Sequence, residues 1–72
     1  METRMFSRTI AVRSSNGIRS ETFNRGERVK YIRRFGKAVM FEPVDPHHIA
    51  GTYTMEWDEF LTSTDLVREA NA

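Results

Sequence analysis

Residues 27–44 read ERVKYIRRFGKAVMFEPV, and this stretch decides the fold. In its first half the odd positions are mostly apolar and the even positions mostly basic, with Ile32 and Arg33 as the exceptions. A period of two is typical of a strand that buries one face. Gly36-Lys37 then predicts a two-residue type II′ turn, because that turn requires glycine at its first position. The stretch therefore predicts a central β-hairpin over residues 27–45.

The turn at Gly36-Lys37 also sets the register of the two strands. Because side chains alternate between faces, a slip by one residue would exchange the two faces completely. We expect Tyr31 and Phe35 to face the core, and Phe41 to lie among cations on the other face. The expected cross-strand pairs are Phe35 with Ala38, Arg33 with Met40, Tyr31 with Glu42 and Val29 with Val44 on one face, and Arg34 with Val39, Ile32 with Phe41 and Lys30 with Pro43 on the other.

A second hairpin is predicted before the central one. Residues 5–13 mix apolar and basic side chains, which is a weak strand signal. Asn16-Gly17 predicts a type I′ turn, because both residues tolerate the positive φ values that this turn requires. Such a turn would place Ile10 opposite Phe23. The alternative for this region is a mobile basic arm that ends near residue 20.

The pattern changes towards the C-terminus. Residues 52–57 alternate between polar and apolar side chains, which predicts a strand with one buried face. Asp58–Leu61 then predicts a helical turn, with two carboxylates where the helix dipole favours them. Thr62 and Asp65 have the spacing of a helix cap. The final segment is therefore interpreted as either a short helix or a short strand.

Together these elements predict a mainly β fold. We expect about five antiparallel strands in a small barrel or strongly bent sheet, with a short helical turn near residue 60. The order of the elements resembles an SH3-like barrel in architecture, and no residue motif ties the chain to a family. We divide the chain into a basic strand, hairpin or flexible arm at residues 1–20, a small β-barrel domain at 21–69 and a frayed tail at 70–72.

Charge is sorted along the chain. Residues 1–37 hold ten of the eleven Lys and Arg residues and three of the ten Asp and Glu residues, a net charge of +7. Residues 38–72 hold one basic and seven acidic residues, a net charge of −6. This split predicts one surface suited to polyanions and another suited to cationic partners, unless the fold pairs the two halves.

Composition excludes several classes of protein. The chain has no cysteine, which excludes disulfides, thiol nucleophiles and cysteine-based metal sites. No segment approaches the roughly 18 consecutive apolar residues that a transmembrane helix needs. The N-terminus contains no hydrophobic stretch that could serve as a signal-peptide core. We therefore expect a cytoplasmic protein without a membrane role.

Catalytic and metal-binding patterns are also missing from the sequence. It contains no nucleophile with a neighbouring base and no phosphate-binding glycine loop, so we expect neither enzyme activity nor a cofactor. Asp45, His47 and His48 form a metal-like cluster, but adjacent histidines on a strand would point to opposite faces. We therefore expect no metal site.

The cationic side of the central hairpin is the main candidate for a binding surface. Clustered cations neutralise phosphates, and an aromatic ring among them stacks on bases. We expect a small non-enzymatic protein that binds nucleic acid, single-stranded in preference, or a nucleic-acid-associated protein. A regulatory or accessory factor of bacterial, phage or plasmid type fits this size. The candidate nucleic-acid-binding residues are Arg28, Lys30, Arg33, Arg34, Lys37 and Phe41.

Two other functions compete with this one. The first is a protein–protein interaction module that docks through acidic residues of the C-terminal half, namely Glu56, Asp58, Glu59 and Asp65. The second is a homo-oligomer of structural role, in which basic and acidic halves pair between subunits. The nucleic-acid hypothesis depends on the cations remaining exposed instead of pairing with carboxylates of the same molecule.

Overall fold

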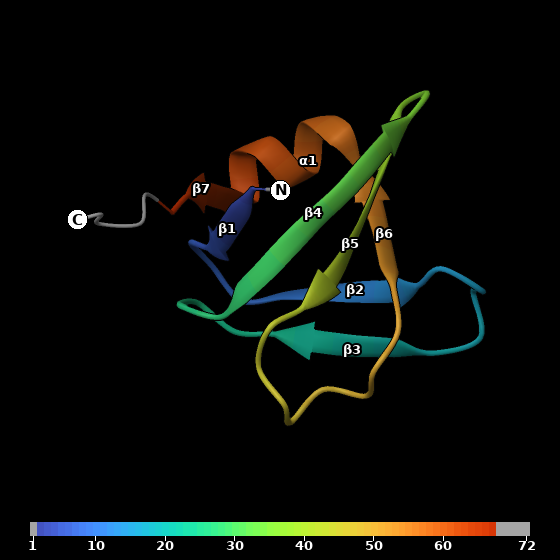
Figure 1. The fold of residues 1–72 in the computed structure, drawn as a ribbon, viewed down its shortest axis with the longest axis horizontal. Coiled ribbons are helices and arrows are strands. Elements are labelled where there is room, and N and C mark those ends of the chain that lie inside the picture. The colour runs from blue at the N-terminus through green and yellow to red at the C-terminus, as the bar shows by residue number, and fades with distance from the viewer. Residues whose placement is uncertain (1, 68–72) are drawn as a thin grey trace.

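The central hairpin forms where the alternation predicts it, and the rest of the sheet is built around it (Figure 1). A computed structural model describes residues 2–67. The seven strands are antiparallel and follow the order β3-β2-β6-β5-β4-β1-β7 across the sheet. The elements are β1 (Thr3–Phe6), β2 (Ile10–Ser14), β3 (Ser20–Phe23), β4 (Arg28–Phe35), β5 (Ala38–Pro43), β6 (Tyr53–Glu56), α1 (Trp57–Ser63) and β7 (Thr64–Leu66).

The sheet curls into a half-barrel, which confirms the predicted mainly β fold class. Figure 1 shows β2 and β3 running across the direction of β4 and β5. Helix α1 lies beside β4, on the side away from β2 and β3. The sheet has two strands more than the expected five, because the segment expected as one strand at 5–13 divides into β1 and β2, and the final segment adds β7. The predicted frayed tail at 70–72 lies outside the described residues.

The predicted register of the central hairpin is correct for the three pairs nearest the turn and wrong beyond Ile32. Phe35 pairs with Ala38, and the next two pairs also match the prediction. A β-bulge then leaves Ile32 without a partner, and an extra residue of this kind reverses the alternation of faces. Beyond the bulge the pairs are Tyr31 with Phe41, Lys30 with Glu42 and Val29 with Pro43.

The N-terminal hairpin has the predicted register but a different turn. Ile10 lies opposite Phe23, as expected. The type I′ turn is wrong, because Gly17 has a positive φ of 76° but Asn16 does not have a positive φ. Instead the Asn16 side chain accepts hydrogen bonds from Ser14 Oγ at 2.6 Å and from the Ile18 backbone at 3.0 Å. Hydrogen bonds to the Asn16 side chain therefore hold the loop, in place of the two consecutive positive φ values that were expected.

The C-terminal region contains the predicted helical turn, and of the two structures left open for the final segment it forms the strand. Helix α1 begins at Trp57, and strand β7 begins directly after Ser63. The predicted cap at Thr62 is wrong, because its hydroxyl donates back to the carbonyls of Asp58 at 3.1 Å and Glu59 at 3.2 Å. Within residues 2–67 no helix is long and apolar enough to cross a lipid bilayer.

Aromatic rings form most of the core. Phe23 is central: its ring centroid lies 5.3 Å from that of Phe6 and 5.2 Å from that of Tyr53. The same ring stacks on the imidazole of His48 at 4.1 Å, so the core continues directly into a polar cluster. The buried apolar side chains are Phe6, Val12, Phe23, Val29, Val39, Phe41, Tyr53, Met55 and Phe60.

Candidate functional site

The outer face of β4 carries a line of cations. Side chains on one face of a strand repeat every second residue, about 6.6 Å apart. Arg28 and Lys30 follow this rule on the face opposite Val29, and the bulge at Ile32 brings Arg33 onto the same face. We call Arg28, Lys30 and Arg33 the β4 cationic row. Without the bulge, Arg33 would point to the opposite face.

The cations of β4 and its turn are exposed, and none of them forms an ion pair with another residue of the range 2–67. Arg28, Lys30, Arg33, Arg34 and Lys37 are all exposed. In the part of the chain that the structure describes, the arginines that do form ion pairs with carboxylates are Arg4, Arg8 and Arg19. Lys30 has Glu42 opposite it in the register, but the two do not form an ion pair. The β4 cations therefore remain available to a ligand.

The aromatic partners of these cations differ from the predicted one. Phe41 is fully buried in the core, so its expected place among the cations is wrong. Phe35 takes that place: it is 40% exposed, and the Arg33 guanidinium lies 5.4 Å from its ring centroid. The expectation that Phe35 faces the core is wrong for the same reason, because the bulge exchanged the faces. Tyr31 is half-buried and packs against the core.

A second aromatic lies at the start of α1. The Arg34 guanidinium stacks over the half-buried ring of Trp57, 4.6 Å from its centroid. Both line an open pocket, which also includes Lys37, Glu56 and Asp58. Cations and carboxylates are therefore interleaved at this end of the hairpin, in contrast to the β4 cationic row.

The acidic residues proposed for protein docking do not form one separate surface. All four are exposed. Glu59 lies 3.9 Å from Arg8, and Asp65 lies on β7 opposite Met5. Glu56 and Asp58 belong to the pocket that also holds Arg34 and Lys37.

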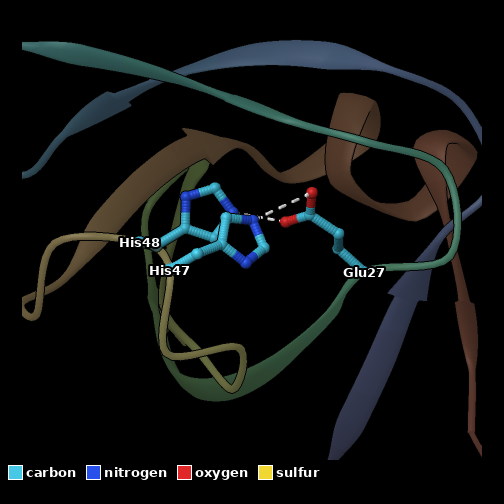
Figure 2. Close-up of side chains that lie close together, drawn as sticks. All are labelled: Glu27, His47 and His48. Atoms are coloured by element: carbon cyan, nitrogen blue, oxygen red, sulfur yellow. Dashed lines mark hydrogen bonds and ion pairs between the residues drawn. The ribbon is translucent and has the colours of Figure 1, made fainter.

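A second charged site lies at the other end of the sheet, in the loop between β5 and β6. The sequence grouped Asp45 with His47 and His48, but Glu27 takes the place of Asp45 (Figure 2). The two histidines are not on a strand, and their ring centroids are 4.3 Å apart. The expectation that they point to opposite faces is therefore wrong. One ring nitrogen of each histidine and one Glu27 carboxylate oxygen lie within 4.8 Å of one another.

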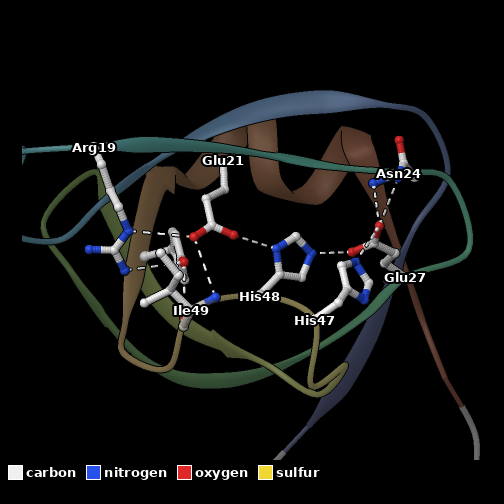
Figure 3. A network of polar contacts seen from close by, with 8 residues as sticks. Arg19, Glu21, Asn24, Glu27, His47, His48 and Ile49 are labelled. Carbon is white, nitrogen blue, oxygen red and sulfur yellow. Dashed lines mark hydrogen bonds and ion pairs between the residues drawn. The ribbon is translucent and has the colours of Figure 1, made fainter.

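His48 bridges two carboxylates, and we call Glu21, Glu27, His47 and His48 the His48 cluster (Figure 3). Its side chain is 4% exposed. Nδ1 contacts Glu21 Oε1 at 2.6 Å, and Nε2 contacts Glu27 Oε1. His47 Nε2 lies 3.4 Å from the other oxygen of Glu27. The cluster thus joins β3, the turn before β4 and the β5–β6 loop.

Further polar groups hold both glutamates. Glu21 Oε2 is 3.4 Å from Arg19 Nε and accepts a hydrogen bond from the Ile49 backbone N–H at 3.4 Å. Glu27 Oε2 accepts from the backbone N–H of Asn24 at 3.1 Å and from its side-chain amide at 3.0 Å. No buried side-chain nitrogen or oxygen among residues 2–67 lacks a hydrogen-bond partner.

These contacts shift the pKa values of the cluster. The hydrogen bond from His48 is the main reason that the pKa of Glu21 falls to about 2. Burial raises the pKa of Glu27, but hydrogen bonds from His48 and the Asn24 backbone outweigh burial and lower it. Burial lowers the pKa of His48, but its bonds to Glu21 and Glu27 outweigh burial and raise it. The cluster is therefore a carboxylate–imidazolium–carboxylate triad, in which each charged form stabilises the next.

Sequence reasoning did not find Glu21 and Glu27 as members of a site. They lie 27 and 21 positions before His48, and tertiary packing brings the three together. The one sequence signal was the adjacent pair of histidines. Comparison of the chain with protein-family models, with curated proteins and with solved structures gives no significant match.

Proposed function

We propose that this protein binds single-stranded nucleic acid through the β4 cationic row, as a non-enzymatic regulatory or accessory factor in the cytoplasm. The observation that carries the proposal is the row itself. Arg28, Lys30 and Arg33 share one exposed face, and none of them forms an ion pair among the described residues. Exposed cations in line neutralise backbone phosphates and release counterions, which gives affinity without base recognition.

Phe35 extends the row in a way that suits unpaired bases. It lies on the same face as Arg33 and is 40% exposed. Base–aromatic stacking contributes about 1–3 kcal/mol per base and tolerates any sequence. A duplex hides the faces of its bases, so an exposed ring beside cations favours a single strand. Recognition of a duplex sequence would require an element that enters a groove, and the seven-residue α1 starts with Trp57 packed under Arg34.

The acidic docking hypothesis has weaker support. Glu59 already has Arg8 as a partner, and Glu56 and Asp58 share their pocket with Arg34 and Lys37. A cationic protein partner would therefore meet a mixed surface in place of an acidic one. On the face of the β4 cationic row, the strand registers among residues 2–67 place Glu42 opposite Lys30, and Asp65 beyond Met5 from Arg28.

The test is fluorescence anisotropy of a labelled single-stranded oligonucleotide titrated with the protein. Lys30→Glu combined with Arg33→Glu should weaken binding at least about ten-fold, because two phosphate contacts become repulsive. The matched control is Arg13→Glu with Arg25→Glu, which reverses two exposed cations outside the row. The control should bind within about two-fold of wild type at equal salt.

Two outcomes would reject the proposal. One is no binding of either DNA or RNA by the wild-type chain at low salt. The other is an equal loss of affinity in the row variant and its control. That result would mean that affinity depends on the net charge of the protein and not on the position of the cations. Circular dichroism of each variant checks that the sheet is intact.

A further inference from the structure

The His48 cluster has the composition of a metal site. We propose that Glu27, His47 and His48 bind a divalent cation of borderline softness such as Zn²⁺. Two imidazole nitrogens and one carboxylate oxygen are a donor set that Zn²⁺ prefers, and three protein ligands leave a fourth position for water. This proposal concerns a different site from the β4 cationic row and does not depend on nucleic-acid binding.

The distances fit a tetrahedral ion. Zinc bonds of about 2.0–2.1 Å to nitrogen and oxygen place neighbouring ligand atoms about 3.3 Å apart. His47 Nε2 and Glu27 Oε2 are already 3.4 Å apart. The contact between His48 Nε2 and Glu27 Oε1 would open as the ion replaces the proton between them. His47 can adjust to the ion, because its side chain is 60% exposed and lies in a loop.

The residues around the ligands are arranged as in an outer coordination shell. Metal-binding histidines usually donate their other ring N–H to a carboxylate, which fixes the tautomer and the ring orientation. His48 Nδ1 contacts Glu21 Oε1 at 2.6 Å, so Nε2 is the nitrogen directed at the site. Phe23 stacks on the same imidazole with 17° between the planes. Asn24 holds Glu27 through two hydrogen bonds.

His47 connects the buried part of the site to solvent, because its side chain is exposed while Nε2 lies beside Glu27. The exposed side of His47 provides the route by which the ion enters. Glu27 already has three partners, His48 and two donors of Asn24, so its bonding in the fold does not require His47.

The test is isothermal titration calorimetry of the whole chain with ZnCl₂ at neutral pH, after treatment with EDTA. Wild-type protein should bind one ion per chain. Removing an outer-shell partner of a metal site lowers affinity about 10–100-fold, so loss of a ligand in His47→Ala should exceed about ten-fold. His47 is the suitable ligand to replace, because its ring is exposed and its removal leaves the contacts of His48 with Glu21 and Glu27 in place.

Asp45→Asn is the matched control, because it changes the carboxylate of the same loop that lies outside the site. It should bind zinc as wild type does. Nitrogen-15 spectra of the histidine rings should show zinc at Nε2 of His48, with Nδ1 still protonated. Wild-type affinity in His47→Ala, an equal loss in Asp45→Asn, or no saturable binding at millimolar zinc would each overturn the site.

Discussion

The β4 cationic row and the His48 cluster differ in the burial and pairing of their charged groups. In the cluster, Glu21 and Glu27 are held by hydrogen bonds, and the ring of His48 is buried between them. In the row, exposed cations follow one another along a strand without ion pairs among residues 2–67. Removing one partner of a buried ion pair is strongly destabilising, because it leaves an uncompensated charge, whereas exposed charges contribute little to stability. The cluster is therefore coupled to the stability of the fold, whereas the row is the surface that we propose for nucleic acid.

The largest effect is expected where the cluster is broken. His48→Ala leaves two carboxylates facing each other without their cation, and breaking a buried ion pair costs about 3–5 kcal/mol. That is a large part of the free energy of unfolding of a domain this small. Urea unfolding in EDTA at pH 6 measures the loss. The matched variant in the row, Lys30→Ala, should change stability by less than about 0.5 kcal/mol. Equal effects of the two variants would contradict the contrast.

The pH dependence of stability in EDTA sharpens the same contrast. The pKa of Glu21 is about 2 in the fold against an ordinary 4.5, so its stabilisation is present above about pH 4.5 and is lost as the pH falls towards 2. The pKa of His48 is raised above its ordinary 6.5, so its stabilisation is complete below about pH 6.5 and is lost as the pH rises through the raised value. Stability should therefore be greatest between about pH 4.5 and 6.5. A free energy of unfolding that stays constant from pH 6 to pH 9 would contradict this role of His48.

A smaller effect is expected at the junction of the hairpin and α1. Arg34→Ala removes the guanidinium that covers Trp57 and should cost about 0.5–1 kcal/mol, the usual contribution of an exposed cation–π contact. It should also shift the fluorescence of the single tryptophan to longer wavelength. Arg33→Ala is the control, because Arg33 stacks on Phe35 and does not contact Trp57. An unchanged emission spectrum in Arg34→Ala would show that the stack does not shield the indole.

The sequence predicted what depends on local patterns. Alternation over residues 27–35 and the Gly36-Lys37 turn gave the central hairpin and its first three pairs. The bulge was missed, although Ile32 and Arg33 broke the alternation at that point. One extra residue in a strand exchanges the faces beyond it, so a single omission misplaced both Phe35 and Phe41.

What could not be predicted depends on contacts between distant segments. Strand β7 pairs with β1 across almost the whole chain, with Leu66 opposite Arg4. The cluster needs Glu21 from β3 and Glu27 from a turn to meet a loop histidine. Local sequence patterns carry no information about such tertiary contacts. The exposure of Arg28 and Lys30 follows from alternation alone, whereas Arg33, which the predicted register placed on the core face, is exposed because of the bulge.

The central claim is that the β4 cationic row neutralises phosphates of a single strand. Its most direct test is the affinity for a single-stranded oligonucleotide measured over a series of KCl concentrations. Each phosphate neutralised on a single strand adds about −0.7 to the slope of log affinity against log salt. Three contacts predict a slope of about −2 for wild type, falling towards zero in the triple variant Arg28→Ala, Lys30→Ala and Arg33→Ala. A wild-type slope near zero, or an unchanged slope in the triple variant, would contradict the account.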